Sequence, residues 1–140
     1  MQAIDKSQIE DRLTDWIERI GNLYDEIESW LHNDLQYRFE RSHPTTLEKE
    51  MMEKFGVNKI QLPTANIFRH NNLVTSLKPK GLWVIGANGR VDLISKSKLI
   101  MLLDLADQFQ PAEWHIVYSK NWHKRSPLNK QNLITVLNSL

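Results

Sequence analysis

The chain has 140 residues, of which 41% are hydrophobic and none is cysteine. This composition excludes a disulfide framework, thiolate zinc sites and cysteine nucleophiles, and the length suffices for a core without such staples. A formal net charge of +1 conceals a split, because residues 1–56 carry 13 acidic and 7 basic side chains whereas residues 57–140 carry 11 basic and 4 acidic ones.

The first 31 residues predict a long helix. Ser7 and Glu10 have the spacing of a capping box. Apolar residues then recur at alternating spacings of four and three, which is the pattern of a helix with one apolar stripe. The stripe either covers the core of the protein itself or forms an interface with a second copy or another protein. The candidate interface residues are Ile9, Leu13, Trp16, Ile20, Leu23, Ile27 and Trp30.

A second helix is expected after a connector. Residues 33–44 form the connector, which continues the first helix in part. Thr45 and Glu48 repeat the capping-box pattern after Pro44, and Gly56 is a suitable residue to end a helix. Together with the first helix, this segment would give an N-terminal helical pair.

The middle of the chain predicts strands. Residues 66–72 and 73–78 are two short strands with a turn at Asn71–Asn72. Asn88–Gly89, between the apolar runs 82–87 and 90–94, is the strongest local signal for a hairpin, because a type I′ turn needs positive φ at both central residues.

The C-terminal third combines strand and helix signals. Residues 97–109 fit a helix with one apolar face or a buried strand at 99–103, and periodicity does not separate the two. Residues 114–118 have the composition of a strand. Ser126–Pro127 would open a final helix with proline in its first turn. Its apolar face would consist of Leu133, Val136, Leu137 and Leu140.

These elements predict one α+β domain over residues 1–140. Its antiparallel sheet would have about four to five strands, with the N-terminal helical pair and the C-terminal helix packed against it. Residues 1–56 would form the acidic helical part, and residues 57–140 the basic, strand-rich part.

Catalytic motifs are missing from the sequence. It contains no Gly-x-Ser-x-Gly elbow and no His-Glu-x-x-His pair, and its five histidines have no metal-ligand spacing. We therefore predict no catalytic residue, no metal site and no cofactor. The N-terminus does not resemble a signal peptide, and the longest aliphatic run, 99–103, is too short to span a bilayer. A cytoplasmic protein without membrane contact is expected.

Residues 120–125 are the most concentrated basic segment. Cations neutralise phosphates, and an exposed tryptophan can stack on an unpaired base. The alternative is a solvated loop whose tryptophan packs onto the core. The candidate nucleic-acid-binding residues are Arg69, Lys120, Trp122, His123, Lys124 and Arg125.

Three functions follow from these patterns. The first is a non-enzymatic interaction or regulatory module that self-associates or docks another protein through the N-terminal helix. The second is binding of RNA or single-stranded DNA by the basic half. The third, by analogy of layout only, is a metal-independent ribonuclease-like enzyme that uses His115 or His123 as acid or base. We favour the first. The sequence leaves open whether the basic side chains converge on one face.

Overall fold

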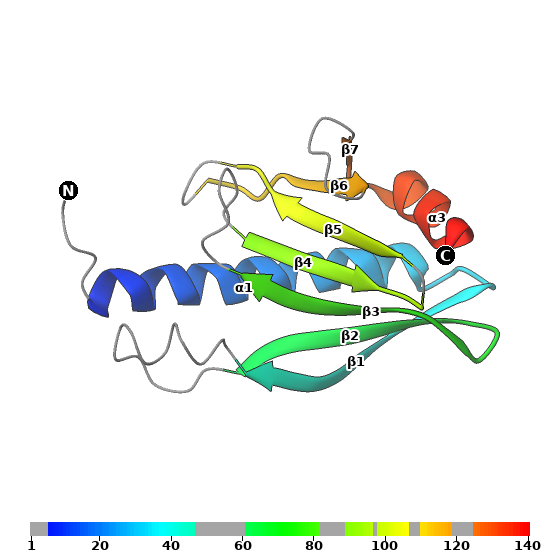
Figure 1. Cartoon of the computed structure of the whole chain (residues 1–140), viewed down its shortest axis with the longest axis horizontal. Helices are drawn as coiled ribbons and strands as arrows, with labels where there is room; N and C mark the ends of the chain where they lie inside the picture. The colour runs from blue at the N-terminus through cyan, green and yellow to red at the C-terminus, as the bar shows by residue number, and fades with distance from the viewer. Residues whose placement is uncertain (1–5, 47–60, 82–88, 97, 107–109, 119–124) are drawn as a thin grey trace.

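The structure, a computed structural model, describes residues 6–46, 61–81, 89–96, 98–106, 110–118 and 125–140. These residues form a long N-terminal helix, a seven-stranded antiparallel sheet and a C-terminal helix (Figure 1). The helices are α1 (Lys6–Leu31) and α3 (Lys130–Ser139). The strands are β1 (Tyr37–Thr46), β2 (Gln61–Arg69), β3 (Asn72–Gly81), β4 (Gly89–Ile94), β5 (Leu99–Asp104), β6 (Trp114–Tyr118) and β7 (Arg125–Pro127).

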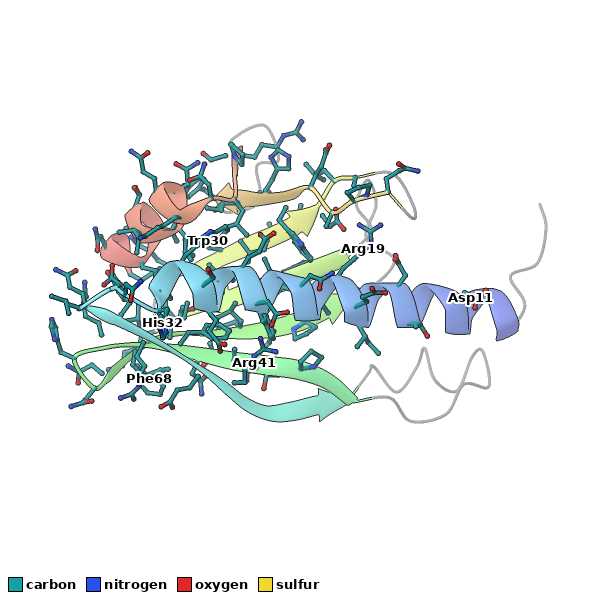
Figure 2. All side chains as sticks on the ribbon, turned by 180° about the vertical axis from the view of Figure 1, so that it is seen from behind. Asp11, Arg19, Trp30, His32, Arg41 and Phe68 are labelled. Carbon is teal, nitrogen blue, oxygen red and sulfur yellow. The ribbon has the colours of Figure 1, made fainter. Side chains whose placement is uncertain are left out.

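The sheet is a simple meander. Its spatial order, β1 to β7, is also its order along the chain, so each strand pairs with its sequence neighbour. β1 and β7 are the two edges. Helix α1 lies lengthwise across one face of the sheet (Figures 1 and 2). The second helix, α3, lies near the end of α1 from which the chain enters β1 (Figure 1).

The main core fills the space between α1 and the sheet. The apolar stripe of α1 packs on inward-facing residues of β2 to β6 and on the apolar face of α3. At one point the helix comes so close to β4 that a Cβ atom at Gly89 would overlap the indole of Trp16. Fully buried members of this core include Trp16, Ile20, Leu23, Tyr24, Ile27, Ile67, Leu77, Leu93 and Leu102.

β5 explains why the segment 97–109 was ambiguous. Its residues Ile100 to Asp104 are all buried. Ile100 and Leu102 face α1, whereas Met101 and Leu103 join Val117 in a second buried cluster on the opposite face. A strand buried on both faces has a continuous apolar run instead of alternation. The strand alternative for this segment is therefore confirmed.

The expected fold class is wrong in its details, although α-helices and an antiparallel sheet are both present. The sheet has seven strands, not four to five. The N-terminal helical pair is not observed among the described residues, because residues 37–46, assigned to a connector and a second helix, form β1. The rest of that expected helix, from residue 47 to residue 56, lies outside the described residues. Tyr37 and Phe39 alternate with charged residues, which is the period of a strand.

The predicted hairpin around Asn88–Gly89 is also wrong. β4 pairs with β3 on one side, where Leu93 lies opposite Leu77, and with β5 on the other. The described partners of β4 are thus β3 and β5, in a register other than the expected one, and residues 82–88 lie outside the described residues. The turn between β2 and β3 is one residue earlier than expected, at His70–Asn71, and both residues have positive φ (48° and 69°).

The C-terminal elements are close to expectation. β6 forms at the predicted residues. Helix α3 starts later than predicted, since Ser126 and Pro127 belong to β7 and Asn129 is the N-cap, its side chain accepting a hydrogen bond from the backbone N–H of Asn132 at 2.8 Å. Its predicted apolar face packs on the main core.

Candidate functional site

The predicted interface residues in the middle of α1 lie inside the protein. Trp16, Ile20, Leu23 and Ile27 have 0–1% of their surface exposed, and Trp30 is half-buried against the same core. The side chains of Ile9 and Leu13 lie outside the described ones. The central part of the stripe therefore covers the core of this chain. Of the two alternatives given for the stripe, this is the first, and the intermolecular interface is the second.

The structure does not bring the predicted nucleic-acid-binding residues together, as far as it describes them. Arg69 lies on β2, with its guanidinium 5.8 Å from the centre of the Tyr37 ring. Arg125 lies exposed on β7. Five strand spacings separate β2 from β7, about 24 Å. The predicted residues Lys120, Trp122, His123 and Lys124 lie outside the described part of the chain.

Other described cations are equally dispersed. Lys78 is on β3, Lys96 and Lys98 flank the turn between β4 and β5, and Lys130 starts α3. The histidines are separated as well. His70 lies in the turn just before β3, whereas the register places His115 level with the end of β3, about 30 Å away along the strand.

A groove lies between α1 and the edge of the sheet at β6 and β7. We call it the α1–β6 groove. It has a volume of about 490 Å³. Its lining comes from α1, from the segment that enters β6, from β6 itself and from the chain after β7. The lining residues are Asn22, Leu23, Glu26, Pro111, Ala112, Glu113, Trp114, His115, Pro127 and Leu128.

The groove has an apolar floor and an acidic rim. Leu23 and Trp114 are buried, with 1% and 8% exposed, and Leu128 is half-buried beside them. Glu26 and Glu113 are exposed. Among the described residues, no lysine or arginine lines the groove and neither glutamate has a cationic partner. The described part of the groove therefore carries two uncompensated carboxylates beside an apolar surface.

Backbone hydrogen bonds fix the walls of the groove. The N–H of Glu113 donates to Asp104 Oδ1 at 2.9 Å, and its carbonyl accepts from the N–H of Leu105 at 2.9 Å. On the other wall, the N–H of Leu128 donates to the carbonyl of Trp114 at 2.9 Å. Both polar backbone groups of Glu113 are thus used, so its carboxylate projects from a held position.

A buried ion pair connects this wall to α1. Arg19 Nη1 donates to Asp104 Oδ2 at 2.7 Å, Nε donates to Asp15 Oδ2 at 2.7 Å, and Nη2 donates to the carbonyl of Gln110. Burial opposes the charge of Arg19, but the two carboxylates more than offset it and raise the pKa of the guanidinium. Arg19 and Asp104 therefore clamp the segment that carries Pro111, Ala112 and Glu113.

His115 adds a polar atom that the fold does not use. Its side chain is half-buried at the groove, and its Nδ1 is buried without a hydrogen-bond partner. Among the described lining residues, Glu26 and Glu113 are the other ionisable groups, and no serine, threonine, tyrosine or lysine is present as a nucleophile. The arrangement is suited to binding a group that is both cationic and apolar.

A second cavity of about 490 Å³ lies at the corner between α1 and β1. Its lining includes His32, Asp34, Arg38 and His70, so both signs of charge are present. Arg38 already pairs with Glu40 at 3.1 Å. This cavity has no comparable charge preference, and we place the candidate site at the α1–β6 groove.

Two kinds of site are not found among the described residues. They contain no cluster of three or more metal-ligating side chains. They also contain no helix that is long and apolar enough to cross a bilayer.

Comparisons with known proteins give no assignment. No protein-family model, no curated protein and no solved structure matches the chain. The interpretation of the groove therefore depends on its own chemistry.

The groove was not anticipated from the sequence. Its glutamates are 87 positions apart in the numbering, and neither belongs to a motif. Glu113 is one of only four acidic residues in the basic part of the chain, and this was the single available signal.

Proposed function

We propose that the protein is a non-enzymatic interaction module that docks a partner protein in the α1–β6 groove. The docked segment would carry a basic side chain next to an apolar one. This retains α1 as a docking element but moves the contact from its buried stripe to its flank. The pair of uncompensated carboxylates, Glu26 and Glu113, beside the floor of Leu23 and Trp114 is the observation that supports the proposal.

The physical argument has two parts. Opposite charges across an interface favour encounter and select the partner. The apolar floor then contributes through the area that it removes from water. Because the walls are held by Asp104 and by the bond between Leu128 and Trp114, little ordering is needed on binding.

A labelled peptide of alternating lysine and leucine tests the proposal by fluorescence anisotropy. It should bind, whereas the peptide with glutamate in place of lysine should not. The double variant Glu26→Gln/Glu113→Gln should weaken binding roughly tenfold, because two exposed ion pairs of about 0.5–1 kcal/mol each are lost. Amide NMR signals of residues 111–115 and 128 should shift when the lysine peptide is added.

Asp11→Asn is the matched control. Asp11 is exposed and lies near the N-terminal end of the same helix, away from the groove (Figure 2). This variant removes one unit of charge, as the single variants Glu26→Gln and Glu113→Gln each do, and it should leave binding unchanged. Equal weakening by Asp11→Asn and by the two single groove variants would mean that only net charge matters.

A labelled single-stranded oligonucleotide tests the alternative function, which is binding of RNA or single-stranded DNA. The proposal predicts no specific oligonucleotide binding, because the described cations are dispersed. Oligonucleotide binding that weakens steeply with salt, together with no peptide binding, would contradict the proposal and favour nucleic-acid recognition.

A further inference from the structure

The outer edge of β1 is not paired with any strand of the described residues. The strand has ten residues and pairs with β2 on one side, and no described strand lies on its other side. Figure 1 shows its outer edge facing away from the rest of the sheet. An unpaired edge presents backbone N–H and C=O groups that can pair with another strand. The opposite edge, β7, has only three residues and is a poorer template.

The first half of β1 is regular. From Tyr37 to Ser42 the register with β2 is continuous, and the irregularity comes later, between Ser42 and Thr45. Six residues without a bulge are long enough to form a strand pair. Leu35, two residues before β1, has 98% of its surface exposed and is the most exposed large apolar side chain described.

We propose that β1 pairs antiparallel with β1 of a second copy, about a two-fold axis that passes through Phe39. The axis is perpendicular to the sheet, so α1 stays on the same side in both copies. Arg38 of each copy then lies directly opposite Glu40 of the other. The two Phe39 side chains meet at the axis, where an aromatic cross-strand pair is favourable.

Charge selects this register. In an antiparallel pair, residues directly opposite each other lie on the same face of the sheet. The two-fold axis must therefore pass between the two copies of one residue, and each choice of this residue gives a different register. An axis at Arg38, Glu40 or Arg41 would put each of these charges opposite its own copy, which is unfavourable. Only the axis at Phe39 pairs opposite charges on this stretch.

The side chains are accessible to solvent, and the guanidinium of Arg38 lies 4.8 Å from the centre of the Phe68 ring. Arg38 and Glu40 are each 53% exposed and lie on the sheet face opposite α1. Within one copy they pair at 3.1 Å, and in the dimer each can also meet the opposite charge of the other copy. Phe39 is half-buried, edge-to-face with Tyr24 at 5.8 Å between ring centres, which fixes it beside the axis. This surface is at the other edge of the sheet from the α1–β6 groove.

Sedimentation equilibrium with charge reversals tests the dimer. The wild-type mass should approach twice that of one chain as concentration rises. R38E and E40R should each remain at the mass of one chain, because each places like charges opposite each other. An equimolar mixture of the two variants should recover twice the single-chain mass, since opposite charges again meet across the axis.

The mixture distinguishes a contact between two copies from an effect of the substitutions on the structure of a single chain. Either reversal also breaks the bond between Arg38 and Glu40 within one chain, and mixing does not repair that bond. K96E, which reverses an exposed charge in the turn between β4 and β5, is the control and should leave the mass unchanged. A wild-type protein that stays at the mass of one chain, a dimer that survives R38E, or a mixture that stays at the single-chain mass would each overturn the proposal.

Discussion

The two flanks of α1 are tied to the sheet by the same chemistry in different surroundings. Towards β5, Arg19 pairs with Asp104, and their side chains are 7% and 1% exposed. Towards β1, Arg41 pairs with Asp25, and their side chains are 44% and 67% exposed. Figure 2 shows Arg19 and Arg41 on opposite sides of the helix. Because the two contacts are alike, their difference in burial determines how much each contributes to the free energy of unfolding.

The difference has a simple electrostatic origin. In water the attraction within an ion pair is screened, and the entropy lost by ordering the two side chains offsets most of the favourable electrostatic free energy. In the interior the attraction is stronger, but each ion has lost its hydration and depends on its partner. Asp104 meets this need with one bond from Arg19 and two from backbone N–H groups of Ala106 and Glu113.

The largest effect is expected from Asp104→Asn. The variant removes the more deeply buried of the two carboxylates that pair with Arg19, so the free energy of unfolding should fall by about 3–5 kcal/mol. Urea denaturation followed by circular dichroism measures it. A loss below about 1 kcal/mol would show that the buried flank is no stronger than an exposed ion pair.

An intermediate effect is expected from Tyr24→Phe, on the side of α1 that faces β1 and β2. Tyr24 is buried and donates a hydrogen bond to the carbonyl of Pro63 at 2.8 Å. Loss of this bond should reduce the free energy of unfolding by about 1 kcal/mol at neutral pH, measured by the same urea titration.

The same residue gives a pH dependence. Burial raises the pKa of the Tyr24 phenol above its ordinary value of 10.0, and the charge of Arg41 opposes this only in part. The stability that this residue contributes is therefore complete below pH 10.0 and is lost as pH rises towards the raised pKa. Above pH 10 the wild type should lose stability faster than Tyr24→Phe. Parallel curves would contradict this.

The smallest effect is expected from Arg41→Gln. It removes the pairs with Asp25 and Glu28, which are solvent-exposed. The free energy of unfolding should fall by about 0.2–1 kcal/mol, and the difference should shrink in high salt. A salt-independent loss as large as that of Asp104→Asn would remove the distinction between the flanks.

The sequence predicted the elements whose pattern is local. The stripe of α1 has one helical face, and the composition of β6 is that of a strand, so both were found. β1 was missed because Pro44 and the capping-box pattern at Thr45 pointed to a helix, whereas pairing with β2 holds this segment extended. The hairpin at Asn88–Gly89 failed because the turn signal says nothing about which strands already occupy both edges of β4.

The groove could not be predicted for a different reason. Its lining comes from positions 22–26, 111–115 and 127–128, and only the tertiary fold brings them together. In the sequence, Glu26 does not differ from the other acidic residues of the helix. Glu113 can be assigned to a site only because the fold places it in the same groove as Glu26. The charge split was visible in the sequence, but its partial neutralisation was not: Arg19 and Arg41 are basic residues of the acidic part that hold its carboxylates within the fold.

The meander also sets an order of events during synthesis. Each strand can pair with its predecessor as it leaves the ribosome, and the connections have only 2 to 14 residues, so strand pairing costs little loop-closure entropy. Helix α1 emerges before the sheet, yet Asp104, a partner of Arg19, is 85 residues further along the chain. Although Phe39 of β1 contacts Tyr24 of the helix, most of the apolar side of α1 stays exposed until the later strands complete the core.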